Sequence, residues 1–95
     1  MLINLKQPTK TLAAEIMVKI IKSKTTGPDL IDALKEEGWE ITVITKDGYM
    51  NLDDMGGNYS TWKAQKGKHN LYIFWSNEWW ILDVSDKPLS PKDYQ

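Results

Sequence analysis

Residues 26–45 read TGPDLIDALKEEGWEITVIT, and within them the hydrophobic spacing changes from that of a helix to that of a strand. Leu30, Ile31 and Leu34 recur at helical spacing and form one apolar stripe. From residue 39 onward, apolar and polar side chains alternate as they do in a strand with one buried face. This stretch therefore predicts a helix that leads directly into β structure.

Both ends of this helix are marked by suitable residues. Thr26 is a favourable N-cap, Pro28 fits the first turn, and Asp29 complements the positive end of the helix dipole. Gly38 is expected to end the helix in the left-handed conformation. Trp39 is then placed to pack back onto the last turn, as commonly occurs beside such a cap.

A first helix is expected from about residue 10 to residue 24. Glu15, Lys19 and Lys22 share one narrow face at helical spacing, and apolar side chains fill most of the remaining circumference. This apolar surface is wider than that of an ordinary surface helix. The helix is therefore expected to make contacts on two sides, with the sheet and the second helix or with a partner chain.

The second half of the chain reads as a series of strands. The dipeptide Asp47-Gly48 predicts a two-residue hairpin turn between strands at 39–46 and 49–52, followed by a loop at 53–58. Further strands are expected at 59–64, 71–75 and 79–84. The predicted fold class is α+β, with two N-terminal helices packed on one face of an antiparallel β-meander of about five strands. Residues 1–84 form this single domain, and residues 85–95 are expected to be an extended, partly mobile tail.

The last predicted hairpin carries apolar side chains on both faces. With Asn77-Glu78 as its loop, Trp75 pairs with Trp80 on one face, and Phe74 lies on the other. The helices can cover only one of these faces. The second is then covered by the N-terminal segment, by the tail or by closure of the sheet, or else it binds a partner.

The composition excludes several classes of function. The 95 residues include five Trp, no Cys, no Arg and one His, so disulfides and Cys-based metal sites are excluded. No metal, cofactor or catalytic constellation is expected, and the chain is not expected to be an enzyme. There is no apolar run near the length of a membrane span, and the N-terminus does not resemble a signal peptide, so a cytoplasmic location without membrane contact is expected.

Charge is unevenly distributed along the chain. Residues 1–24 carry five Lys and one Glu, whereas residues 25–58 carry two Lys and eight acidic residues, a balance of −6. The whole chain has a net charge of −1. Because the chain is not basic and lacks Arg, nucleic-acid binding is expected to be less favourable than protein binding.

These observations predict a small non-catalytic protein-binding module, compatible with an inhibitor or accessory factor of a phage or mobile element. The expected contact residues are the aromatic side chains Trp62, Tyr72, Phe74 and Trp79. The alternative is a single-stranded nucleic-acid-binding protein that adds the neighbouring basic residues Lys63, Lys66, Lys68 and His69. A homodimer formed through the first helix or the open sheet face is a third hypothesis.

Overall fold

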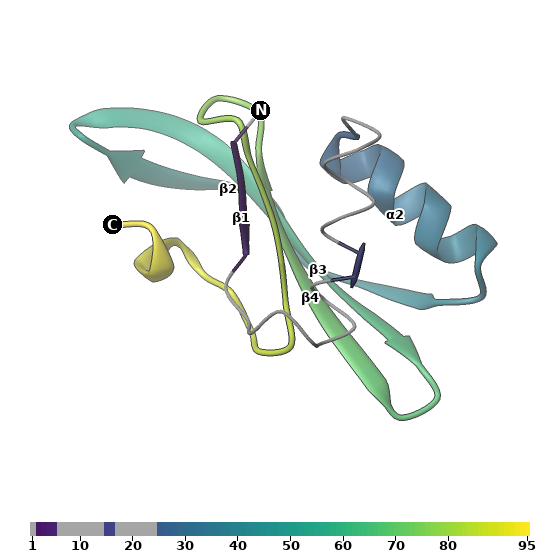
Figure 1. Ribbon diagram of the computed structural model, residues 1–95. Helices are drawn as coiled ribbons and strands as arrows, with labels where there is room; N and C mark the ends of the chain where they lie inside the picture. The colour runs from purple at the N-terminus through teal and green to yellow at the C-terminus, as the bar shows by residue number, and fades with distance from the viewer. Residues whose placement is uncertain (1, 6–14, 17–24) are drawn as a thin grey trace.

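A computed structural model of the chain describes residues 2–5, 15–16 and 25–95, which form an α+β fold (Figure 1). One helix packs on an antiparallel sheet of four strands, in the order β5-β4-β3-β2, and β1 lies beside β5 and runs parallel to it. The elements are β1 (Leu2–Leu5), α2 (Gly27–Glu36), β2 (Glu40–Leu52), β3 (Met55–Lys66), β4 (His69–Ser76), β5 (Ile81–Ser85) and the 3-10 helix η1 (Pro91–Asp93).

Both predicted ends of α2 are confirmed. The side chain of Thr26 accepts a hydrogen bond from the backbone N–H of Asp29 at 3.3 Å. At the other end, Gly38 has a φ of 95°. The backbone N–H of Trp39 donates to the carbonyl of Leu34 at 3.0 Å, which completes the expected Schellman cap.

Most of the predicted first helix lies outside the described residues. Within its range, Glu15 and Ile16 are helical, and Ile16 is buried in the cluster that also holds the apolar residues of α2. The N-terminal strand β1 was not expected from the sequence, because no alternating pattern of sufficient length marks it.

The predicted hairpin turn at Asp47-Gly48 is wrong. Residues 40–52 form one strand, β2, and the chain reverses at Asp53-Asp54, where the φ angles are 51° and 63°. Both central positions of a two-residue type I′ turn need such positive φ values, and Asp tolerates them better than most residues. Residues 55–58, expected in a loop, instead begin strand β3, so the antiparallel part of the sheet contains four strands.

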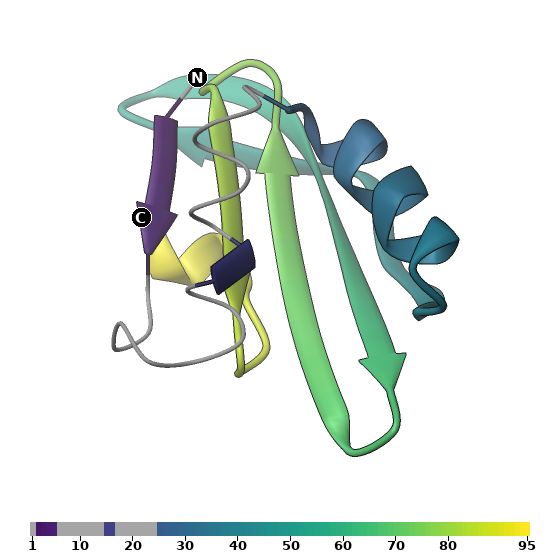
Figure 2. The same cartoon turned by 45° about the vertical axis from the view of Figure 1, so that its right-hand side comes forward.

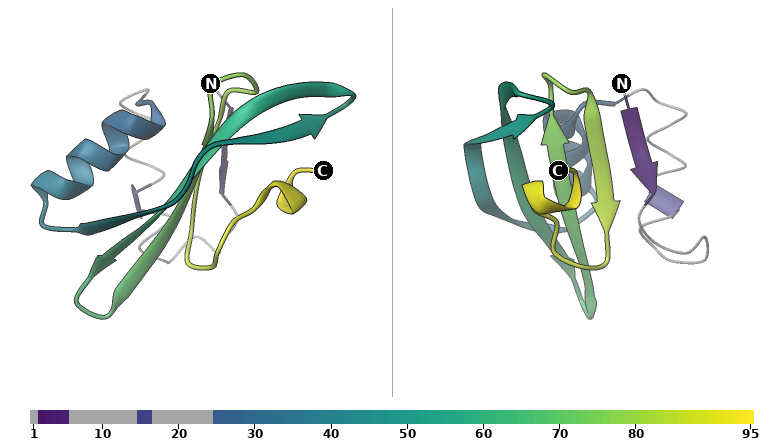
Figure 3. Two further views of the ribbon diagram at one scale, coloured as in Figure 1. Left: turned by 180° about the vertical axis from the view of Figure 1, so that it is seen from behind. Right: turned by 90° about the vertical axis from the view of Figure 1, so that its left-hand side faces the viewer.

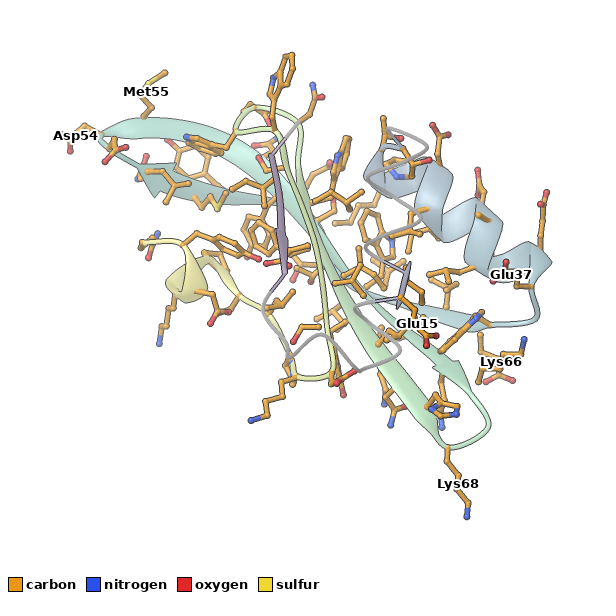
Figure 4. All side chains as sticks on the ribbon, viewed as in Figure 1. Glu15, Glu37, Asp54, Met55, Lys66 and Lys68 are labelled. Atoms are coloured by element: carbon orange, nitrogen blue, oxygen red, sulfur yellow. The ribbon has the colours of Figure 1, made fainter. Side chains whose placement is uncertain are left out.

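Asp47-Gly48 lies instead in an irregular part of the β2–β3 ladder. The register shifts by one residue between Val43 and Thr45 and again between Thr45 and Gly48. Each shift is a β-bulge, which bends a strand and increases its twist. Beyond these bulges, the hairpin curves toward the side of the sheet opposite α2, and its tip carries Asp54 and Met55 (Figures 1 and 4).

The predicted pairing of Trp75 with Trp80 is also wrong. Trp75 pairs with Leu82, and residues 77–80 form a four-residue connection in place of the expected two-residue loop. The register therefore differs by two residues, which keeps the side chains of β5 on their predicted faces because strand side chains alternate with a period of two. Trp80 is left in the turn with a φ of 52° and is 61% exposed.

The sheet has a buried apolar cluster on each face. The first face packs against α2 (Figure 2), and its buried members are Ile16, Leu30, Ile31, Leu34, Trp39, Ala64, Leu71, Ile73, Leu82 and Val84. The second cluster is formed by Met50, Phe74 and Ile81, with Leu52, Tyr59, Trp79, Leu89 and Tyr94 packed against them. The extended tail was expected over residues 85–95. Ser85 instead ends β5, and residues 86–95 contain η1 and fold back over this second face (Figure 3).

Candidate functional site

A groove opens on the sheet at the start of α2, next to the bulged part of β2. It consists of two cavities, of about 290 Å³ and 190 Å³. The larger is lined by Pro28, Val43, Thr45, Lys46, Asp47, Ser60, Trp62 and Trp75, and the smaller by Asp47, Asn58, Tyr59, Ser60, Trp75, Asn77 and Glu78. Because Asp47, Ser60 and Trp75 line both cavities, we treat the two as one groove.

The apolar half of the groove is built on two tryptophans. Trp62 pairs with Val43 across the β2–β3 ladder, and Val43 is 56% exposed. Trp75 comes from β4 and packs under the first turn of α2, where a Cβ on Gly27 would overlap its side chain. Both tryptophans are half-buried against the first cluster. Their positions are therefore held by the core while part of each ring lines the groove.

The bulges in β2 shape the floor of the groove. Two extra residues on β2, with no counterpart on β3, prevent this part of the strand from lying flat in the ladder. Asp47 takes a left-handed φ of 53°, and its backbone N–H donates to the Ser60 hydroxyl oxygen at 3.3 Å. This bond ties the bulge to β3.

The smaller half of the groove is polar and acidic. Asp47 and Glu78 are exposed at its lining, together with two asparagines, and no basic side chain among the described residues lines this half. The residues from 25 to 58, which contain α2 and β2, carry the balance of −6. A cationic group entering this half would therefore be attracted by its surroundings.

The aromatic residues predicted as contacts do not gather at one place. Trp62 lines the groove. Phe74 is fully buried in the second cluster and offers no surface to a partner. Trp79 packs against that same cluster, and Tyr72 is half-buried on the strand position that pairs with Lys63 and Ser85.

The basic residues predicted for nucleic-acid binding are also separated. Lys66 donates from Nζ to the backbone carbonyl of Glu37 at 2.6 Å, so it binds the C-terminal end of α2. Lys68 lies at the tip of the β3–β4 hairpin and points away from the sheet (Figure 4). His69 is exposed beside it, and Lys63 is half-buried farther along β3. None of the four lines the groove.

Sequence reasoning missed Val43, Asp47, Trp75 and Glu78 as groove residues. Trp75 was predicted to pair with Trp80 on one face of the last hairpin, and Asp47 to lie in a hairpin turn. Asp adopts left-handed backbone angles more readily than most residues, and this was the one indication in the sequence that residue 47 is unusual. Such angles occur in turns and in bulges, so they do not distinguish the two. The groove itself arises from contacts between α2, β2 and β4, which no local pattern encodes.

The described residues contain no group of three or more His, Asp or Glu side chains placed to hold a metal ion. A helix able to cross a membrane is likewise not found in this part of the chain. On the second face, the hydroxyl of the half-buried Tyr94 donates to Oδ2 of the buried Asp83 at 2.8 Å. Burial, together with the nearby Asp83 carboxylate, raises the pKa of Tyr94.

Comparisons of the chain with models of protein families, with curated proteins and with solved structures gave no match.

Proposed function

We propose that this chain is a non-catalytic protein-binding module whose groove takes a partner segment with a basic side chain beside an apolar one. The observation that carries the proposal is the division of the groove into an apolar half around Trp62 and an acidic half around Asp47 and Glu78. A module of this kind acts by occupying a surface of its partner, as an inhibitor or accessory factor does.

The apolar half supports binding of an aliphatic or aromatic side chain. Trp62 and Trp75 present partly exposed apolar surface that is already held in place by the core, and Val43 adds exposed apolar surface beside them. Burial of apolar surface contributes about 25 cal/mol per Å². Tryptophan is also among the residues that contribute most often to interface energy.

The acidic half supports binding of a Lys or Arg side chain. The two carboxylates attract the cation, and the Trp75 ring, which lines both halves, offers a face for a cation–π contact. The attraction acts over a partly exposed surface, so it contributes more to specificity than to affinity.

Single-stranded nucleic acid remains the alternative function, and the charges of the groove favour protein over it. Phosphate groups laid along the groove would face Asp47 and Glu78, and Lys46 is the single basic residue of the lining within the described part of the chain. The salt-dependent attraction that dominates nucleic-acid binding is therefore weak at this surface.

The proposal is tested with defined probes and the ¹⁵N-labelled full chain. The indole N–H signals of Trp62 and Trp75 are followed by NMR during addition of the peptide Ac-Ser-Leu-Arg-Leu-Ser-NH₂. Two further probes are added in separate titrations for comparison: the same peptide with Glu in place of Arg, and a ten-nucleotide oligothymidylate. We expect the Arg peptide to shift both indole signals, with a Kd of about 1 mM, as befits a short ligand, and the Glu peptide to leave them unchanged.

Asp47→Asn and Glu78→Gln should each weaken binding of the Arg peptide several-fold. Asn is chosen at position 47 because it also tolerates the left-handed φ there. Glu37→Gln removes the same charge outside the groove lining and should have no effect. Val43→Thr should weaken binding, and Ile44→Thr, a similarly exposed neighbour that does not line the groove, should not. Equal shifts with the Glu peptide, or shifts with the oligothymidylate alone, would refute the proposal.

A further inference from the structure

The second sheet face, which bears the buried residues Met50, Phe74 and Ile81, is covered by residues 86–95, here called the C-terminal segment. Figures 1 and 3 place this segment on the opposite side of the sheet from α2. Two of its side chains, Leu89 and Tyr94, pack into the second cluster. The contact is therefore made by two apolar anchors that are five residues apart.

Of the two anchors, Tyr94 makes both an aromatic contact and a hydrogen bond. Its ring centroid lies 4.4 Å from that of Phe74, at an interplanar angle of 35°. Its hydroxyl donates to Oδ2 of Asp83, a residue that is fully buried. Beyond it, the side chain of Gln95 donates from Nε2 to the backbone carbonyl of Asn51 at 3.3 Å. The face thus receives an aromatic ring, a hydroxyl donor and an amide donor at defined positions.

The C-terminal segment has its own local structure. Ser90 and Asp93 form a capping box around η1, in which the backbone N–H of Ser90 donates to Oδ2 of Asp93 at 2.7 Å. Residues 86–88, which connect it to β5, are exposed. The C-terminal segment belongs to no strand of the sheet, and the strand pairing from β2 to β5 is complete without it. The segment is therefore attached by side chains and by an exposed connection rather than by strand pairing.

We propose that the second face is a binding site for a peptide segment that carries a leucine and, five residues later, a tyrosine, and that the C-terminal segment occupies this site as an intramolecular ligand. Asp83 and Phe74 supply the specificity, because they receive the hydroxyl and the ring of the tyrosine. A segment of a partner protein with the same two anchors would bind in place of the C-terminal segment.

The exposed connection at residues 86–88 determines how tightly an outside segment must bind to replace the C-terminal segment. A short flexible connection gives its ligand an effective concentration in the millimolar range. An outside segment must therefore bind tightly, or be held nearby by a second contact, before it displaces the C-terminal segment. Trp62 packs against the first cluster, whereas Tyr59, in the smaller half of the groove, packs on the second. The indole signal of Trp62 therefore reports binding in the groove separately from exchange on the second face.

The test begins with the full chain, folded intact, in which a protease recognition sequence has been inserted between Asp86 and Lys87. After cleavage, a fluorescein-labelled peptide with the sequence of residues 86–95 is added, and binding is followed by fluorescence anisotropy. We expect binding to the cut chain at least 100-fold tighter than to the uncut chain, because cleavage removes the competing tethered ligand. A peptide with Tyr94→Ala should bind about 30-fold more weakly, as for a hot-spot residue.

A peptide with Lys92→Ala, a change at an exposed position, serves as the matched control and should bind as well as the unaltered peptide. Circular dichroism of the cut chain, after removal of the released segment by gel filtration, reports whether the sheet persists. Loss of the sheet at that step would overturn the proposal, because the C-terminal segment would then be an integral part of the core. Equal binding to cut and uncut chains, or no effect of Tyr94→Ala, would overturn it as well.

Discussion

Tyr94 and Asp83 form a partly buried polar contact between the C-terminal segment and β5. A hydrogen bond to a charged group contributes about 1.5–3 kcal/mol. Tyr94→Phe keeps the ring on Phe74 and removes this bond, so we expect a loss of unfolding free energy of that size at pH 7. Urea denaturation measures it, and Tyr49→Phe, at an exposed tyrosine, should cost less than about 0.5 kcal/mol.

The same residue predicts a dependence of stability on alkaline pH. The pKa of Tyr94 is raised in the folded chain, first by burial and then by the charge of Asp83. The unfolded chain releases this proton above about pH 10, whereas the folded chain retains it. Stability from this group is therefore fully present below pH 10 and falls above it, by less than about 1.4 kcal/mol per pH unit because solvent screens this partly exposed group. The difference between wild type and Tyr94→Phe isolates this slope, and a constant difference from pH 9 to 11 would contradict the prediction.

Among the elements, the β2–β3 hairpin departs furthest from the sequence-based expectation. Its turn uses Asp53-Asp54, both with positive φ, although the more favourable dipeptide Asp-Gly occurs six residues earlier. Placing the turn at Asp47-Gly48 would leave the pairs of residues 48–52 with 55–59 unmade. The longer ladder and the burial of Met50 therefore outweigh the local preference of the dipeptide.

This turn retains a conformational strain that one substitution should relieve. Asp54 has a φ of 63°, a region that glycine occupies without steric cost. We expect Asp54→Gly to raise the free energy of unfolding by about 0.5–1 kcal/mol. Thermal and urea unfolding would detect the gain. Asp86→Gly, at an exposed position without positive φ, should give no gain, and a destabilised Asp54→Gly chain would argue against this turn geometry.

Across the whole molecule, the five tryptophans occupy different environments. Trp39 is buried under α2, Trp62 and Trp75 line the groove, Trp79 packs on the second cluster, and Trp80 is exposed. Acrylamide should therefore quench Trp80 most and Trp39 least. Single Trp→Phe variants measure each contribution: Trp80→Phe should remove the largest part of the quenchable emission, and Trp39→Phe the smallest. A reversed order would contradict this assignment of burial.

The local features of the chain could be read directly from its residues. Thr26, Gly38 and Trp39 mark the ends of α2 because capping depends on hydrogen bonds within a few residues. The two faces of β4 also follow from its alternation, and they stay correct despite the error in register, which was an even number of residues. The abundance of apolar residues on both faces predicted that the second face is either covered within the chain or bound by a partner, and residues 86–95 cover it.

Contacts between residues that are distant in the chain decide three features: which segment covers the second face, where β2 bulges, and where the groove forms. Leu89 and Tyr94 carry no local signal that they return to the sheet, and the positive φ of Asp47 serves a turn or a bulge equally well. Trp62 lines the groove because two extra residues in β2 bend that strand away from a flat ladder. Short-range patterns fix periodicity and caps, whereas long-range packing selects among registers and coverings that differ little in local energy.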